Sequence, residues 1–279
     1  MKIRFLGTAA AEGVPAIFCQ CDVCRRSRQA GGKNLRTRSQ ALVDDKLLID
    51  FGPDTYWHSM TYGIDLSRIE NCLITHSHSD HLYPDDLSFR RPGYAHIEEG
   101  PKFFNLFGSR PALELLRHSD YSSLNADDDA SEVRIYPKDE FETFWVGEFL
   151  VTALPASHGT ESPYIYMVKR YGKTLLYAHD TTEFKPEVWE YFAERRPHFD
   201  IVTLDCTKAL QPESSKSHMN FSGCVKMRNM LRENGYIDGG TKVCVNHFSH
   251  NGLATYDDLV ETAEKENMIV TYDGLTVEA

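Results

Sequence analysis

One short motif constrains this chain more than any other feature: Thr75-His76-Ser77-His78-Ser79-Asp80-His81. It comes directly after the apolar end of a predicted strand over residues 68–75. Alternation along an extended backbone places His76, His78 and Asp80 on one side. A turn after Asp80 can then bring His81 into the same cavity. Imidazole and carboxylate together suit Zn, Mn or Fe better than Ca or Mg. The motif therefore predicts a metal site where a buried strand ends.

The composition is that of an ordinary globular protein. The chain has 279 residues, of which 41% are hydrophobic and 25% charged, and this excludes disordered and collagen-like classes. No apolar run reaches the roughly 18 residues that a membrane helix needs. The first residues, MKIRFLGTAAAEGVP, are too soon interrupted for a secretory signal, so we expect a cytoplasmic protein with no membrane partner.

The charge is unevenly distributed along the chain. The formal net charge is −11, but residues 1–40 hold eight Lys or Arg against two acids, giving +6 there and −17 in the remainder. Proteins that grip nucleic acid usually present net positive charge, so a nucleic-acid polymer is disfavoured as a partner. A local basic region on an acidic body is better suited to a small anionic substrate.

A second group of metal-capable residues lies near the N-terminus. Cys19, Cys21 and Cys24 form a C-x-C-x-x-C cluster in a chain with seven cysteines and no export signal. In a reducing compartment such a cluster indicates a metal site rather than disulfides. The remaining four cysteines stand in apolar patterns and are predicted to be small core residues: Cys72, Cys206, Cys224 and Cys244.

The order of predicted elements favours one α/β sandwich over residues 1–279, with a Cys-rich loop at about 15–38 and no linker between tethered domains. Residues 39–52 are predicted to form a β-hairpin about Asp44 and Asp45. The acidic stretch 119–132 is predicted to be an exposed loop. Further strands are expected at 133–137, 148–154, 164–169, 173–178, 200–207 and 242–249, and helices at 109–118, 189–196, 220–234 and 255–266.

The histidine motif closely resembles that of the metallo-β-lactamase superfamily. Three later residues follow predicted strands where that family places its other ligands: His158, Asp180 and His247. The resemblance implies an αββα sandwich of two mixed sheets with helices outside. It also implies that His76, His78 and His158 hold one metal, that Asp80, His81 and His247 hold a second, and that Asp180 bridges the two.

Other segments narrow the resemblance to the PhnP-like cyclic phosphodiesterases, which are related to tRNase Z. They are EGVP at 12–15, CQCDVCRR at 19–26, RTRS at 36–39, LIDFGPD at 48–54, SHMN at 217–220 and NHFSH at 246–250. The resemblance implies that His250 completes a Cys₃His structural zinc site with Cys19, Cys21 and Cys24. It further implies that His218 contacts the substrate phosphate, so that His218 and Asp80 are the expected catalytic residues.

Asp50 and Asp205 each end an apolar strand and have two interpretations. Either carboxylate could orient a metal-bound histidine, since such histidines usually donate their other N–H to a carboxylate. Either could instead simply cap a turn. The basic groups at 25–28 and 36–38 could position an anion, although such runs are more often solvated or paired with acids.

The predicted function is hydrolysis of a small, perhaps cyclic, phosphodiester by a metal-bridged hydroxide, with two Zn or Mn ions and one structural Zn. Two alternatives are kept. One is tRNA 3′-end processing, which would need a basic face and a tRNA-gripping arm. The other is a non-catalytic metal-binding module on the same fold. A homodimer is left open.

Overall fold

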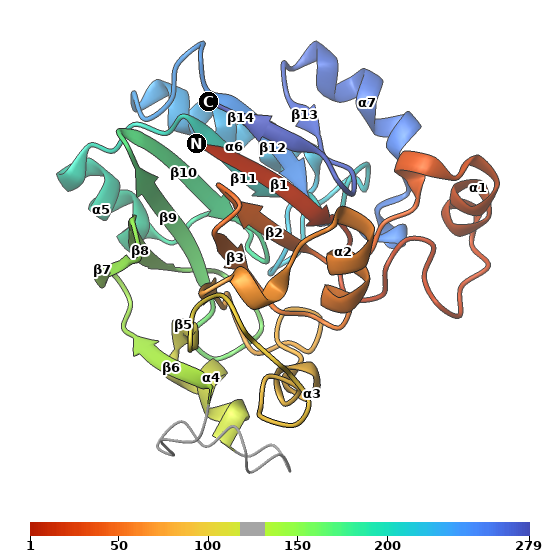
Figure 1. Cartoon of the computed structure of the whole chain (residues 1–279). Coiled ribbons are helices and arrows are strands. Elements are labelled where there is room, and N and C mark those ends of the chain that lie inside the picture. The colour runs from red at the N-terminus through yellow and green to blue at the C-terminus, as the bar shows by residue number, and fades with distance from the viewer. Residues whose placement is uncertain (118–131) are drawn as a thin grey trace.

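The computed structural model describes residues 1–117 and 132–279, and these build two seven-stranded sheets (Figure 1). The loop expected at 119–132 lies outside the described residues except for its last residue. The first sheet has the order β14-β1-β2-β3-β4-β5-β6. It is antiparallel from β14 to β3 and parallel from β3 to β6. Its strands are β1 Lys2–Gly7, β2 Gln40–Val43, β3 Leu47–Ile49, β4 Asn71–Leu73, β5 Phe104–Ser109, β6 Val133–Lys138 and β14 Thr276–Glu278.

The second sheet has the order β13-β12-β11-β10-β9-β8-β7. Its β10 to β13 half is parallel and its β7 to β10 half antiparallel, so both sheets are mixed. Strands of the parallel half, buried on both faces, read as continuous apolar runs, as in LLYA and IVTLD. The strands are β7 Thr143–Val146, β8 Phe149–Pro155, β9 Tyr164–Arg170, β10 Lys173–Ala178, β11 Ile201–Asp205, β12 Lys242–Asn246 and β13 Ile269–Val270.

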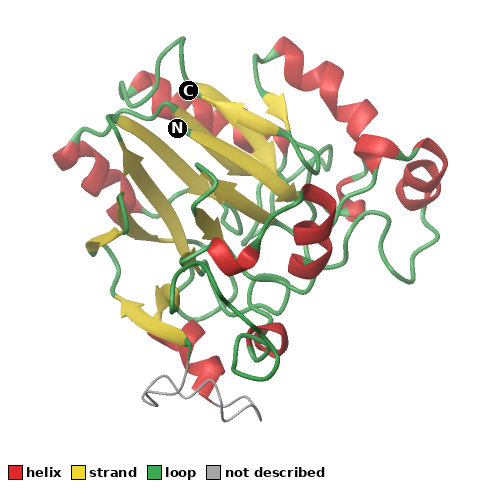
Figure 2. Cartoon of the chain, viewed as in Figure 1, coloured by secondary structure: helices red, strands yellow, loops and turns green. Residues whose placement is uncertain are grey.

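Three apolar layers make the sandwich. The central layer joins the two sheets and contains Phe5 and Ile49 from the first with Tyr166 and Tyr177 from the second. Helices cover the outer face of each sheet (Figure 2). The helices are α1 Asp22–Ala30, α2 Thr55–Tyr62, α3 Pro84–Leu87, α4 Arg110–Arg117, α5 Pro186–Arg195, α6 Phe221–Glu233 and α7 Tyr256–Lys265, with 3₁₀ turns η1 Gly32–Asn34, η2 Leu66–Arg68 and η4 His250–Gly252.

This architecture confirms the predicted αββα sandwich. The β2–β3 hairpin is also confirmed: Asp44 and Asp45 have φ of 49° and 55°, the paired positive values that suit a tight turn between right-twisted strands. The single-domain reading stays a prediction. In the described parts of the chain, no helix is both long enough and apolar enough to cross a membrane.

Three helices were not anticipated, and three strands are shorter than predicted: 68–75, 200–207 and 242–249 become β4, β11 and β12. α1 buries only Val23, Cys24 and Ser27. Its sequence is mostly charged and polar, so the apolar pattern that would predict a helix is weak. The expected strand at 68–75 shrinks to β4, because η2 occupies its start and the backbone leaves the sheet before the histidine motif. The four cysteines expected in the core are fully buried, which confirms that prediction.

Candidate metal centre

The histidine motif forms the loop that follows β4. The N–H groups of His81 and Leu82 both donate to the His78 carbonyl, at 3.0 and 2.9 Å, and this closes a turn over residues 79–81, which contains Asp80 instead of following it. Phe51 then donates to the His81 carbonyl at 2.8 Å, which fastens the loop to the end of β3. As a result the rings of His76 and His81 lie 4.3 Å apart between centroids. The local prediction that all four side chains share one cavity edge agrees with this geometry.

His158, from the loop after β8, joins two histidines of the motif. His78 Nδ1 lies 3.0 Å from His76 Nε2 and 3.1 Å from His158 Nε2. Three nitrogens that each lie about 2.0 Å from one Zn²⁺ in tetrahedral geometry would stand about 3.3 Å apart. The observed spacing is close to that value, so these three residues fit a metal ion.

The second cluster consists of Asp80, His81 and His247. His81 Nε2 lies 3.1 Å from Asp80 Oδ2 and 3.4 Å from His247 Nε2. His247 follows β12 on the opposite sheet, so this cluster spans the mouth of the sandwich. All three side chains are buried, and their ligand atoms lie within 4.8 Å of one another.

Asp180, which follows β10, stands between the two clusters. Its Oδ1 lies 3.4 Å from His158 Nε2, and its Oδ2 lies 3.0 Å from His81 Nε2 and 3.0 Å from His247 Nε2. One carboxylate oxygen therefore faces each cluster. This is the arrangement that a carboxylate needs to bridge two metal ions.

Three residues at the site have a left-handed backbone conformation. The φ angles of Asp50, Asp180 and His247 are 68°, 49° and 64°. Residues other than glycine seldom adopt such φ values, although Asp and His do so more often than most. The surrounding structure must hold the backbone in this conformation. Each residue directly follows a strand or lies one residue beyond it, at β3, β10 and β12, so the bend turns each side chain out of the sheet edge.

The protonation states of three groups suit metal ligands. By contrast, in His81 the effect of burial is outweighed by the carboxylates of Asp80, Asp180 and Asp50, which raise its pKa above its usual value. Burial lowers the pKa of the His76 imidazole well below its usual value, which favours the neutral form that binds metals. Burial would raise the pKa of Asp80 and of Asp180, but the neighbouring imidazoles of His81 and His247 outweigh it and hold both values low. Both carboxyl groups are therefore anionic at neutral pH.

Two groups orient the histidines from behind. Asp50 Oδ2 lies 2.7 Å from His81 Nδ1, and the same carboxylate accepts the Thr75 N–H at 2.8 Å. This contact favours the orienting interpretation of Asp50 over the turn-capping one. On the other side, Thr207 Oγ1 lies 2.8 Å from His247 Nδ1. The sequence reasoning missed Thr207; its only signal is its place two residues after the strand-ending Asp205.

His218 reaches the edge of the site from the loop before α6. Its Nδ1 lies 2.9 Å from Oδ2 of the fully buried Asp205, and its ring lies 5.0 Å from the His158 ring. Burial opposes protonation, but the Asp205 carboxylate outweighs it and raises the pKa of His218. The structure therefore places His218 beside the metal-capable clusters as a hydrogen-bond donor, and it gives Asp205 a partner in the site.

The cysteine cluster meets His250 as expected. His250 Nδ1 lies 3.4 Å from Cys19 Sγ and 3.5 Å from Cys21 Sγ, and Cys24 completes a set within 4.8 Å. Tetrahedral Zn²⁺ would separate sulfur and nitrogen ligands by about 3.6 Å. Backbone N–H groups of Ala16, Cys21 and Cys24 donate to the three sulfurs. The bond from Cys21 lowers the pKa of the Cys19 thiol, whereas burial raises the pKa of Cys24 to about 12. The four residues fit a closed zinc site.

Two arginines of the basic N-terminal region have structural partners. Arg36 is buried, donates to Thr8 Oγ1 and the Thr271 carbonyl at 2.7 Å each, and lies 4.1 Å over the Phe248 ring. Arg38 Nη1 pairs with Asp54 Oδ1 at 3.0 Å.

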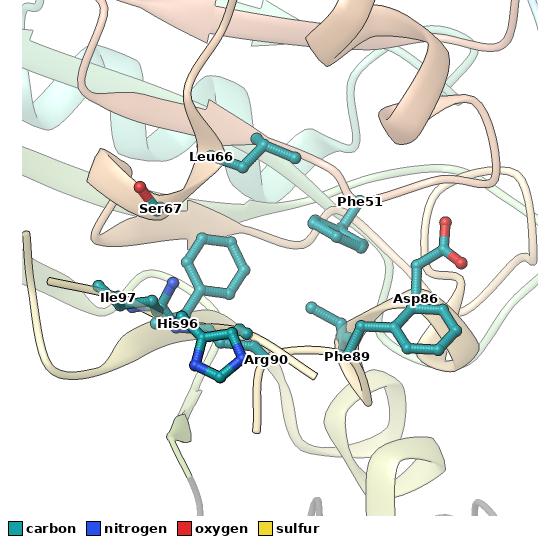
Figure 3. Close-up of a pocket in the computed structure, with 11 residues that line it drawn as sticks. Phe51, Leu66, Ser67, Asp86, Phe89, Arg90, His96 and Ile97 are labelled. Atoms are coloured by element: carbon teal, nitrogen blue, oxygen red, sulfur yellow. The ribbon is translucent and has the colours of Figure 1, made fainter. Parts of the chain in front are cut away.

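A separate cavity of about 230 Å³ lies beside α3 (Figure 3). Its lining is mainly apolar and includes Phe51, Leu66, Phe89 and Phe104. It contains none of the residues of the metal-capable clusters, so it is not part of the candidate centre.

Comparison with known proteins agrees with the observed fold. The family model described as a beta-lactamase superfamily domain matches residues 45–237. Ribonuclease Z of Listeria monocytogenes serotype 4b is 23% identical over 299 residues, covering 98% of this chain and 88% of that protein. An octanoyltransferase of Porphyromonas gingivalis is 36% identical over only 84 residues, which are 29% of this chain and 16% of that protein's length.

Solved structures resemble the chain over its whole length. The crystal structure of a diphosphatase from the PhnP family superposes with a TM-score of 0.73 at 22% identity, covering 99% of this chain and 97% of that one. Zinc-bound PqqB from Methylobacterium extorquens gives 0.76 at 20% identity, covering both chains completely. At these identities the likeness establishes a shared fold.

Proposed function

The chain belongs to the β-lactamase superfamily and is a metal-dependent hydrolase, and from this premise we propose that it is a dinuclear phosphodiesterase acting on a small phosphodiester. The proposed ligands are His76, His78 and His158 for one ion and Asp80, His81 and His247 for the other, with Asp180 between them.

One observation carries the dinuclear proposal: the two oxygens of Asp180 face different clusters. Oδ1 is directed at His158, while Oδ2 lies 3.0 Å from both His81 and His247. A carboxylate that served a single ion would need only one cluster around it. Two cations held a few ångströms apart can clamp the oxygens of a transferring phosphoryl group.

Each residue has a distinct task in the proposed reaction. Two divalent cations, Zn or Mn, would supply a hydroxide nucleophile at neutral pH by lowering the pKa of water. Asp50 and Thr207 hold the rings of His81 and His247 in place. His218, whose pKa the Asp205 carboxylate raises, would donate a hydrogen bond to the phosphoryl oxygens as negative charge develops there. His218 can also deliver a proton to the leaving oxygen.

The likeness to a PhnP-family diphosphatase and the acidic net charge support a small substrate. The likeness to ribonuclease Z supports tRNA 3′-end processing as a second candidate. A net charge of −11 counts against the second candidate, because a long polyanion is repelled by an acidic body. Retention on tRNA at moderate salt would favour it.

The cysteine set has a structural task in this proposal. A Cys₃His site leaves no open position for substrate, so the zinc would fasten the loop at about 15–38 to the segment that carries His247. Ser249 Oγ, two residues after His247, donates to Glu12 Oε1 at 2.5 Å and strengthens the same junction.

The test uses protein reconstituted with Zn or Mn and a substrate panel. The panel contains bis-p-nitrophenyl phosphate, a phenylphosphonate ester, cyclic nucleotides, cyclic ribose phosphates and a tRNA precursor. His78→Ala is the matched control for adventitious hydrolysis. We expect turnover of at least one small phosphodiester and about three ions per chain by elemental analysis. Stoichiometric metal without turnover on any member would support the non-catalytic alternative instead.

A further inference from the structure

Asp50 orients His81 from a strained backbone, which raises the question of what holds Asp50. Its φ of 68° lies in the left-handed region, and a residue there needs external support. Its N–H donates to the Leu73 carbonyl at 2.7 Å. Its carbonyl accepts the side-chain N–H of Gln40 at 2.9 Å, and both groups are buried. Gln40 is therefore part of the support of the Asp50 bend.

The contacts of Gln40 determine which way its amide faces. The Asp50 carbonyl can only accept a hydrogen bond, so the amide nitrogen of Gln40 must face it. The same nitrogen lies 2.8 Å from Thr55 Oγ1, whose own proton goes to the Gly52 carbonyl. The amide oxygen of Gln40 consequently faces His58 Nδ1, at 2.6 Å. His58 must carry a proton on Nδ1.

The other nitrogen of His58 continues the chain. His58 Nε2 lies 2.7 Å from Thr37 Oγ1, which lies 2.6 Å from Asp273 Oδ2. The Thr37 hydroxyl has one proton and can donate to only one of these two groups. Either His58 or Asp273 must donate to it in turn. The network therefore contains one more proton than it would if His58 were neutral and Asp273 were ionised.

Burial favours the neutral form of both groups. It lowers the pKa of His58 to about 4, with a small opposing effect from Asp54, and it raises the pKa of Asp273 despite the hydrogen bonds of Thr37 and Thr8 and the charge of Arg36.

In either arrangement of the Thr37 proton, His58 donates from Nδ1 to the amide oxygen of Gln40. Gln40 donates to the Asp50 carbonyl at the end of the chain. Tyr62 faces His58 and Asp273: its ring lies 6.2 Å from that of His58, and burial raises the pKa of Tyr62 to about 12, so it stays neutral.

We propose that His58 and Gln40 are positioning residues for the metal ligand His81. They anchor the Asp50 bend, and the Asp50 carboxylate in turn sets the orientation of the His81 ring at 2.7 Å. The inference rests on the proposed function, because it takes His81 to be a ligand. It assigns a role to α2, which contributes no ligand but carries His58 into the space between β2 and the C-terminal segment.

Two substitutions at His58 separate positioning from packing. His58→Phe keeps the ring but removes both hydrogen bonds, whereas His58→Asn places an amide N–H near the position of Nδ1. His198→Phe, at a half-exposed histidine outside the network, is the matched control. Zinc affinity is measured by chelator competition, ion by ion. For His58→Phe we expect one of the three ions to bind about 10-fold more weakly, the lower end of the range for outer partners of metal ligands.

The conservative variant and a second site complete the affinity test. His58→Asn should recover most of the lost affinity, and His198→Phe should match the wild type. Gln40→Met is similar in shape and neutral, and it should weaken the binding of the same ion as His58→Phe does. It replaces His58→Phe in the test if that variant does not fold. Equal zinc affinity in the wild type, His58→Phe and Gln40→Met would overturn the inference while leaving the proposed function standing. A wild type that takes no ion beyond the Cys₃His zinc would overturn both.

A spectroscopic measurement tests the chain of donors directly. In zinc-loaded protein labelled with ¹⁵N-histidine, the His58 signals are assigned by their loss in the His58→Asn variant. We expect Nδ1 of His58 to be protonated at neutral pH. A neutral ring protonated only on Nε2 would refute the deduced direction of the Gln40 amide and with it the positioning role.

Discussion

Removing the His218 side chain should separate catalysis from metal binding. His218 Nδ1 is held 2.9 Å from Asp205, which leaves Nε2 available for substrate. Asp205 would keep two backbone donors after the change, the N–H groups of Thr207 at 3.1 Å and Met219 at 3.2 Å. Both donors bind Oδ1, so the buried carboxylate keeps hydrogen bonds on one of its two oxygens, and we expect His218→Ala to fold and to retain its metals.

The expected magnitude follows from the role of a preorganised donor. Removing one donor that contacts developing charge typically lowers kcat by a factor on the order of 10²–10³, or about 3–4 kcal/mol. Because the contact is made mainly in the transition state, KM should change little. Asp205→Asn should lower kcat less steeply, because it removes the carboxylate that raises the pKa of His218 but leaves the His218 ring in place.

The assay compares kcat and KM of wild type, His218→Ala, Asp205→Asn and the control His198→Ala on two phosphodiesters. One substrate has a p-nitrophenolate leaving group and the other an alkoxide. If His218 also delivers a proton, the alkoxide substrate should suffer the larger loss. Metal content is determined on the same samples by elemental analysis.

Two results would refute this reasoning. Loss of one ion in His218→Ala would make His218 a metal ligand. This role is worth testing because the His218 ring lies within 4.8 Å of ligand atoms in Asp180 and His247. An unchanged kcat would make it an ordinary histidine at the rim of the site.

Three further predictions test the centre and its surroundings. Asp180→Ala and His78→Ala should each lower kcat by a factor on the order of 10²–10⁴, and a steady-state rate above about a tenth of wild type would contradict the ligand assignment. Cys21→Ser should release one zinc and lower the melting temperature in calorimetry more than it lowers kcat per folded molecule; the reverse order would point to a catalytic role. Because the pKa of His58 falls from 6.5 in the unfolded chain to about 4 on burial, its contribution to the free energy of unfolding is present above pH 6.5 and is lost as pH falls toward 4. In urea titrations the free energy of unfolding of the wild type should fall by about 2 kcal/mol between pH 8 and 5, and that of His58→Phe should not show this loss. The same pH dependence of the free energy of unfolding in both proteins would refute the prediction.

Local chemistry in the sequence was enough to predict the first half of the centre. His76, His78, Asp80 and His81 lie within six residues after an apolar run, and an extended segment with one turn has few ways to arrange them. The C-x-C-x-x-C cluster is equally local. For both, the observed geometry agrees with what spacing alone suggests.

The distant partners were predicted by resemblance rather than by spacing. His158, Asp180, His247 and His250 are each separated from the motif by two or more strands. A lone histidine or aspartate after a strand has many roles, so no local pattern identifies these residues. The structure brings them together because β8, β10 and β12 lie in one sheet and end at the same edge as β4 of the other.

Sequence reasoning offered Asp50 as a support of the centre, but it did not detect the residues that hold Asp50. His58 lies on a short helix with a weak apolar pattern, and Gln40 begins a strand in which every residue is buried. Their importance arises from hydrogen bonds to groups up to 236 residues apart, as between Thr37 and Asp273. Such contacts depend on side-chain directions that neither propensity nor periodicity encodes.

The sequence by itself determined which ligand chemistry this chain carries, since imidazole, carboxylate and thiolate groups were already placed at local spacings that suit metals. Only the tertiary structure decided how these groups face one another. The two oxygens of Asp180 point to different clusters because its backbone takes a left-handed bend, with φ of 49°, at the end of β10. That bend is held by packing between two sheets, and the packing depends on residues distributed over the whole chain.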